Sequence, residues 1–182
     1  MLTFDFSTFP ILETERLLLR QIVKDDANEM FMLRSNPEIM KYIPREMPKN
    51  LDDAVKHIEF MQGLLENCEC INWAICLKED KKLIGNIGYF RMQPENHRAE
   101  IGYMLNSSFH GKGIMQEALD RIINYGFNDM KLHSIEAVTD PENFASWKLL
   151  EKNGFIREGH FKEDCYWQGK YLDSFVYSLL NK

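Results

Sequence analysis

The residues His110, Gly111, Lys112 and Gly113 form a short segment whose glycine spacing suits the binding of an anion. Residues 99–105 before it contain the aliphatic and aromatic side chains of a strand, and apolar residues after it recur every three or four positions, as in a helix. A loop that leads into a helix presents unpaired backbone N–H groups and the positive end of the helix dipole. We therefore expect a phosphate-bearing ligand at this loop.

Two common phosphate-binding patterns do not fit the loop. A P-loop needs Ser or Thr after its Gly-Lys pair to hold magnesium, and Lys112 is followed instead by Gly113. A dinucleotide-binding fingerprint needs a third glycine three positions after the second, and Gln116 stands there. Taken alone, a left-handed glycine turn that only joins strand to helix is an equal alternative.

Five segments in a fixed order resemble the GNAT superfamily of acyl-CoA-dependent N-acyltransferases. The hexapeptide HGKGIM stands where its members carry Gln/Arg-x-x-Gly-x-Gly/Ala, their coenzyme A pyrophosphate loop, and residues 143–155 resemble their second coenzyme-binding motif. The segments LETERLLLRQ, AEIGYML and DSFVYSLL are similar to the RimJ/RimL-type branch that acetylates ribosomal-protein N-termini. His110 and Met115 depart from the family pattern, which has Gln or Arg and then Gly or Ala at these positions.

The resemblance implies one N-acetyltransferase domain over residues 1–182, with the recognisable family region at about 14–180. Acetyl-CoA would be the cosubstrate, without a metal. The implied acceptor is a primary amine, with the N-terminal α-amine of a ribosomal or other protein favoured. A small amine (polyamine, aminoglycoside or amino acid) and a non-catalytic acyl-CoA-binding module are the alternatives. The implied coenzyme contacts are Met104, Leu105, His110, Gly111, Lys112, Gly113, Ile114, Met115, Asn143 and Ser146.

Acyl transfer to an amine needs a base, because amines are mostly protonated at neutral pH, and a carboxylate is the expected base. Glu100 is the first candidate, since it precedes the loop on the predicted strand and the corresponding glutamate is the base in the histone-acetylating branch of the family. Glu136 is the second, since members of the ribosomal-protein branch carry an acidic residue in this role on that strand. Either glutamate could instead be a surface carboxylate.

The resemblance also implies how the oxyanion and the leaving thiolate are stabilised. A backbone N–H near Met104 and Leu105 would meet the oxyanion. Many relatives protonate the thiolate with a tyrosine one turn into the second-motif helix, but Leu150 stands there, so Ser146 is the candidate partner of the sulphur. A small residue that only lets the helix pack is an equal interpretation of Ser146. These two groups, with Glu100 or Glu136 as the base, would complete an acetyl-transfer site.

The composition is that of an ordinary soluble protein, with 182 residues, 45% of them hydrophobic and 27% charged. The net charge of -6 argues against a nucleic-acid partner and weakly favours a cationic acceptor. No apolar run approaches the roughly 20 residues of a membrane span, and no signal peptide is recognisable, so we expect a cytoplasmic protein without a membrane partner. It is expected to be a monomer or a homodimer.

The cysteines and histidines do not form a recognisable metal or hydrolase site. Cys68 and Cys70 lack the spacing of zinc knuckles, and Cys76 and Cys165 have no neighbouring His. The histidines other than His110 are scattered without a nucleophile elbow, which disfavours a hydrolase triad. We therefore expect no metal, and free thiols in a reducing compartment.

The element pattern predicts a mixed α/β (α+β) fold of the GNAT type. Its central, twisted, mostly antiparallel sheet would have about seven strands, with helices on both faces. The strands are predicted at 16–21, 71–77, 83–92, 98–105, 134–139, 155–161 and 170–180. The helices are predicted at about 25–37, 50–68 and 113–130, with a last one that ends before Gly154.

Overall fold

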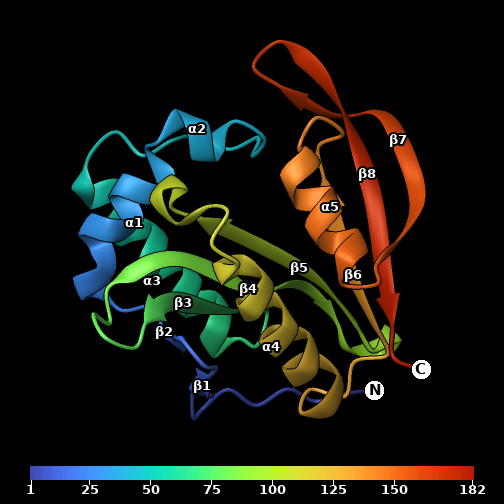
Figure 1. Ribbon diagram of the computed structural model, residues 1–182, viewed down its shortest axis with the longest axis horizontal. Coiled ribbons are helices and arrows are strands. Elements are labelled where there is room, and N and C mark those ends of the chain that lie inside the picture. Colours follow the sequence, from blue (N-terminus) through green and yellow to red (C-terminus); the bar gives the residue numbers. More distant parts are fainter.

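Eight strands form a single sheet in the computed structural model, which describes residues 1–182 (Figure 1). Their order is β1-β2-β3-β4-β5-β6-β8-β7, and all neighbours are antiparallel except β5 and β6, which are parallel. The bounds are β1 Leu12–Glu13, β2 Leu17–Gln21, β3 Ile71–Leu77, β4 Leu83–Gln93, β5 Arg98–Leu105, β6 Ser134–Thr139, β7 Ile156–Trp167 and β8 Lys170–Leu180. The predicted mixed sheet is confirmed, with one additional short strand, β1, and a β7 that continues past Phe161 to Trp167.

Five α-helices cover the two faces of the sheet. They are α1 Ala27–Arg34, α2 Pro37–Met40, α3 Leu51–Glu66, α4 Ile114–Asn128 and α5 Phe144–Lys152. The side chain of Asn50 caps α3 by accepting a hydrogen bond from Asp53 N at 3.0 Å, as its sequence position predicts. Pro37 begins the short helix α2 rather than only ending the helix before it. No helix combines the length and apolar character that a membrane crossing needs.

The alternation of side chains along β3 shows how the two faces are filled. Trp73 and Ile75 point into the larger core, which α4 and α5 cover, and Ala74 and Cys76 point into a smaller core with α1 and α3. All four side chains are fully buried, because a central strand with helices on both faces has no solvent side. The sheet is therefore a rigid platform for the loops that follow its strands.

The sheet splits between β5 and β6, and this split is the feature that shapes the site. The parallel pairing covers only three rungs and ends where Glu100 lies opposite Glu136. Beyond that rung β5 remains paired with β4 up to Leu105, and β6 remains paired with β8 up to Thr139 (Figure 1). Backbone groups that face the split have no strand to pair with, so an extended ligand can bind there.

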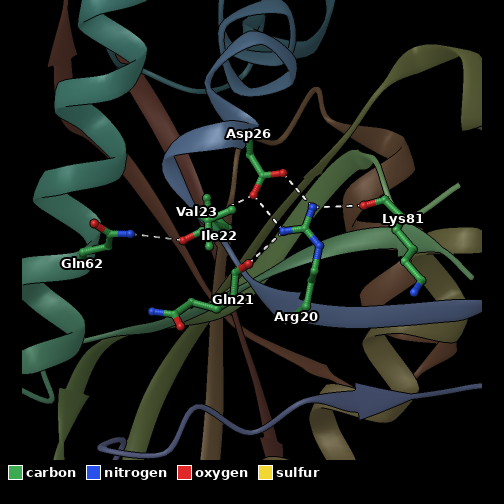
Figure 2. A network of polar contacts seen from close by, with 7 residues as sticks. All are labelled: Arg20, Gln21, Ile22, Val23, Asp26, Gln62 and Lys81. Carbon is green, nitrogen blue, oxygen red and sulfur yellow. Dashed lines mark hydrogen bonds and ion pairs between the residues drawn. The ribbon is translucent and has the colours of Figure 1, made fainter.

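A polar network attaches the start of α1 to the sheet. Arg20 on β2 donates to both carboxylate oxygens of Asp26, at 2.8 and 2.7 Å, and Asp26 also accepts a hydrogen bond from Val23 N at 2.9 Å (Figure 2). Arg20 also donates to the carbonyl of Lys81, in the turn between β3 and β4, at 3.0 Å. The hydrogen bonding between Arg20 and Asp26 raises the pKa of the Arg20 guanidinium. The bidentate geometry fixes α1 relative to both β2 and the β3–β4 turn.

Gly88 on β4 is predicted to be intolerant of a side chain. A Cβ added there would lie 2.2 Å from the carbonyl oxygen of Ile71 and 2.6 Å from Asn72 Cα, and backbone atoms cannot move aside without separating β3 from β4. Gly88→Ala should lower the free energy of unfolding by about 1–3 kcal/mol in urea titrations. Gly63→Ala is the control: Gly63 lies within α3 with nothing within 4 Å of the added atom, so the same change should raise stability by roughly 0.5–1 kcal/mol. Equal effects of the two substitutions would contradict the strand packing.

Candidate active site

The glycine loop lies between the end of β5 and the start of α4. Gly111 and Gly113 both adopt left-handed backbone conformations, with φ of +71° and +75°, and Gly113 is the N-cap residue of α4. The first N–H groups of α4 therefore have no partner within the helix, and they face the same end as the loop. An added Cβ at Gly111 would meet nothing within 4 Å, so the space beside the loop is open. Such an arrangement suits a phosphate group.

An ion pair that the sequence did not indicate fixes this loop. Arg16, just before β2, donates from Nη1 to the carbonyl of Lys112 at 3.0 Å and from Nε to Glu117 in α4 at 2.7 Å. Glu117 also accepts hydrogen bonds from the Thr14 hydroxyl at 2.5 Å and from Arg16 N at 2.9 Å. Burial opposes ionisation of Glu117, but these hydrogen bonds prevail and lower its pKa. Arg16 thus attaches both the loop and α4 to the start of β2, and its charge is balanced by that of Glu117.

His110 is oriented by the end of β5. Its Nε2 lies 2.9 Å from the carbonyl oxygen of Leu105. Because a carbonyl can only accept, Nε2 carries the proton of this hydrogen bond, and Nδ1 of the neutral ring is then an acceptor. His110 can donate to a phosphate through Nδ1 only when the imidazole is protonated.

The second-motif residues lie at the first turn of α5. The Asn143 carboxamide oxygen accepts a hydrogen bond from Ser146 N at 3.2 Å and so caps the helix, which leaves the amide NH₂ able to donate. Leu150 is buried in the hydrophobic core, as is typical of a leucine on the inner face of a helix. At the other end of α5, Asn153 is joined to Gln116 of α4 by two amide hydrogen bonds, at 2.6 and 3.2 Å. The two helices that border the split are therefore held together.

Tyr103 is a site residue that the sequence did not single out. It lies on β5 beyond the last rung shared with β6, and its hydroxyl oxygen is 2.9 Å from Ser146 Oγ on α5. Burial raises the pKa of Tyr103 to about 12, against a smaller opposing contribution from the Ser146 hydrogen bond. The two hydroxyl groups connect the elements on either side of the split.

The two candidate bases lie side by side at the point where the strands separate. Glu100 and Glu136 form the last rung between β5 and β6 and point to the same face of the sheet. Each carboxylate has its own arginine: Arg91 Nη1 lies 2.8 Å from Glu100, and Arg98 pairs with Glu136. These arginines offset the repulsion that two carboxylates on adjacent strands would otherwise experience.

A cavity of about 430 Å³ adjoins Glu136, and Arg91, the ion-pair partner of Glu100, also lines it. Arg98 and Glu136 line one side of it, and Glu158, Phe161 and Asp164 of β7 line the other. The arginines of the cavity are paired with Glu100 and Glu136, whereas no ion pair in the structure involves Glu158 or Asp164. The uncompensated charge of the cavity is thus negative, which suits a cationic ligand.

The backbone at Met104 and Leu105 is regular. Met104 lies opposite Asn86 and Leu105 opposite Gly85, and the irregularity in the β4–β5 pairing is at Phe90–Gln93 instead. Along a regular strand, alternate residues point their N–H and C=O groups to opposite sides. Alternate residues of β5 past Glu100 therefore offer their backbone N–H groups to the split. No group of three or more His, Cys, Asp or Glu side chains is placed to hold a metal ion.

Comparison with known proteins gives one consistent family. Residues 16–156 match the family described as "Acetyltransferase (GNAT) domain". YoaA, an uncharacterized N-acetyltransferase of Bacillus subtilis, is 37% identical over 172 residues, which are 94% of this chain and 97% of YoaA. The structure of a GNAT-family acetyltransferase from Bacillus anthracis superposes with a TM-score of 0.84 at 32% identity and covers 94% of this chain and 98% of its own. The ribosomal-protein-S5-alanine acetyltransferase from Vibrio fischeri superposes with a TM-score of 0.83 at 26% identity over 95% and 97%.

Proposed function

Because the chain belongs to the GNAT acetyltransferase family, we propose that it transfers the acetyl group of acetyl-CoA to a primary amine in the split between β5 and β6. The favoured acceptor is the N-terminal α-amine of a ribosomal or other protein. The observation that carries the proposal is the position of a left-handed glycine loop, at the start of α4, beside two parallel strands that separate after three rungs. The loop can then bind the phosphate groups of an extended ligand, and the unpaired backbone of the split can bind the rest of the same ligand.

The residues around the loop fit the donor. The pyrophosphate of coenzyme A would bind the N–H groups at Gly113 and the start of α4, with the cation Lys112 in the same loop. The pantetheine arm carries amide groups, and the unpaired backbone of β5 and the free NH₂ of Asn143 can bind these. The thioester would then lie near Ser146.

The chemistry follows from the groups on the two sides of the split. A glutamate removes a proton from the amine, the amine nitrogen attacks the thioester carbon, and a backbone N–H near Met104 and Leu105 stabilises the oxyanion. The C–S bond then breaks, its electron pair goes to sulphur, and Ser146 hydrogen-bonds the thiolate. Glu100 is the first candidate base because it shares the β5 face with Met104. Glu136 is the second, and its place in the cavity wall favours it.

Two observations of different kinds bear on the class of the acceptor. The similarity to an S5-alanine acetyltransferase favours a protein N-terminus. The negative charge of Glu158 and Asp164 in the cavity favours any amine that carries positive charge, and this makes a polyamine the second candidate.

Release of free coenzyme A thiol tests this function. We expect acetyl-CoA and a peptide with a free N-terminus to release thiol, whereas the same peptide with an acetylated N-terminus and no lysine should not. Spermidine and an aminoglycoside, tested at equal concentration, measure the small-amine alternatives. Release with spermidine but with no peptide would assign a polyamine acceptor. Release no faster than acetyl-CoA hydrolysis with every amine would identify a non-catalytic acyl-CoA-binding module.

A further inference from the structure

We propose that Tyr103 acts on the leaving sulphur of the acetyl donor through Ser146, as a positioning residue. The inference rests on the proposed function. Tyr103 lies three residues beyond Glu100, where the last rung between β5 and β6 is formed. Its hydroxyl oxygen is 2.9 Å from Ser146 Oγ and 3.4 Å from the Ser146 carbonyl oxygen. One residue pair thus joins β5 to the first turn of α5 across the split.

The hydroxyl groups of Tyr103 and Ser146 carry one proton more than their own hydrogen bond uses, so the pair can donate a further hydrogen bond. Two hydroxyl groups carry two protons, and the hydrogen bond between them uses one. If Tyr103 donates to Ser146 Oγ, the Ser146 proton is free to point into the split. If Ser146 donates instead, the Tyr103 proton is directed at the Ser146 carbonyl oxygen, 3.4 Å away. The first arrangement is therefore the one that makes an O–H group, that of Ser146, available to a thiolate.

The surroundings of Tyr103 keep it in the donating state. Burial raises its pKa to about 12, so the phenol stays protonated at neutral pH. A phenol in this state does not compete with the glutamates as a base. Its bond to Ser146 also restricts the serine hydroxyl, which would otherwise rotate freely.

The pair stabilises the thiolate without giving up a proton. A protonated amine loses two protons on its way to the amide. The first goes to the glutamate and from it to water, and the glutamate takes the second when the tetrahedral intermediate collapses. The electron pair of the broken C–S bond stays on sulphur, so charge and atoms balance. A serine or phenol hydroxyl is a weaker acid than a thiol, so the sulphur takes a hydrogen bond from the pair rather than its proton. A hydrogen bond to an anion lowers the pKa of the group that receives it. The thiol of bound coenzyme A should therefore ionise at lower pH than it would without the pair.

Tyr103→Phe removes the hydroxyl and keeps the ring, and Tyr177→Phe is its matched control. Tyr177 on β8 also hydrogen-bonds a side chain of α5, Glu151, at 3.0 Å, and the ring of Tyr177 is buried in the core. The two substitutions thus each remove one tyrosine hydroxyl that contacts α5. They differ in whether that hydroxyl belongs to the pair with Ser146.

The test measures kcat, KM for acetyl-CoA and the ionisation of the thiol of bound coenzyme A by the ultraviolet absorbance of the thiolate. Tyr103→Phe should lower kcat about tenfold with KM within about twofold, and should move the thiol titration to higher pH by about one pH unit. Tyr177→Phe should change neither. In a Ser146→Ala background Tyr103→Phe should add little, because it acts through Ser146.

Two outcomes separate the inference from the function on which it rests. If the wild-type protein turns over but Tyr103→Phe matches Tyr177→Phe in kcat and in the thiol titration, the role of Tyr103 is overturned and the acetyltransferase proposal stands. If the wild-type protein neither binds coenzyme A nor releases thiol, the function itself fails, and the inference fails with it.

Discussion

Glu100→Gln should lower kcat at neutral pH by roughly 10²–10⁴-fold, the usual contribution of a general base. Glutamine keeps the shape of the side chain but lacks the basic oxygen that removes the amine proton. The loss should shrink as the pH rises, because the free amine then becomes abundant without a base. The affinity for acetyl-CoA should barely change, since Glu100 lies in the first half of β5 and the glycine loop follows the end of that strand. A pH series of thiol-release rates on the wild-type and Glu100→Gln proteins measures both effects.

Glu136→Gln is the matched comparison, because the two glutamates form one rung and each is paired with an arginine. Either substitution removes one carboxylate and leaves one arginine, Arg91 or Arg98, without its partner. A loss that comes only from the broken ion pair would not depend on pH in the range where amines titrate. If Glu100→Gln keeps full activity and Glu136→Gln abolishes it, the base is on β6. Full activity in both variants would exclude a base at this rung.

The parts of the fold that sequence patterns predict are those with a local cause. The bounds of β3 and β6 were predicted to the residue, because each is a buried strand with turn or loop residues at both ends. Asn50 is a recognisable N-cap. The turn at Gln168 and Gly169, both with positive φ, is typical of a two-residue hairpin. The glycines of the loop before α4 are left-handed as well, which is the backbone conformation that the alternative interpretation of this loop names.

The features that escaped prediction depend on contacts between distant segments. Arg16 and Glu117 are 101 positions apart and Tyr103 and Ser146 are 43 apart, so no local spacing relates them. The split between β5 and β6 is a property of pairing, which the sequence of either strand does not encode alone. β7 was predicted too short because nearly all of it is exposed and it lacks the buried apolar alternation that marks a strand.

The candidate site residues come from the resemblance to the family, and the structure adds how they are held. His110 and Met115, the two departures from the family pattern, each make a contact within the fold. His110 is hydrogen-bonded to Leu105, and Met115 packs against the large core. Ser146, assigned as the partner of the sulphur, is part of a hydroxyl pair with Tyr103.

Gly113→Val should weaken coenzyme A binding by on the order of 100-fold, because the loop could no longer hold its left-handed conformation. At a φ of +75° a β-branched residue is strained whatever the space, and an added Cβ would meet only Arg16 Nη2, at 3.5 Å. The expected cause is therefore a reoriented backbone at the start of α4, with its N–H groups no longer directed at the phosphate, rather than a steric clash with protein atoms.

Gly169→Val is the matched control for this change. Gly169 has a φ of +83° in the β7–β8 turn, and an added Cβ there would meet nothing within 4 Å, so the substitution imposes the same kind of backbone strain far from the glycine loop. Thermal unfolding of both variants shows whether their folds are equally intact.

Calorimetric titration of coenzyme A into the wild-type, Gly113→Val and Gly169→Val proteins tests the donor site most directly. The expected result is one site per chain in the wild type, a dissociation constant about 100-fold weaker in Gly113→Val, and an unchanged constant in Gly169→Val. Unchanged affinity in Gly113→Val, or equal losses in both variants, would place the coenzyme away from the loop and contradict an acetyl donor bound in the split between β5 and β6.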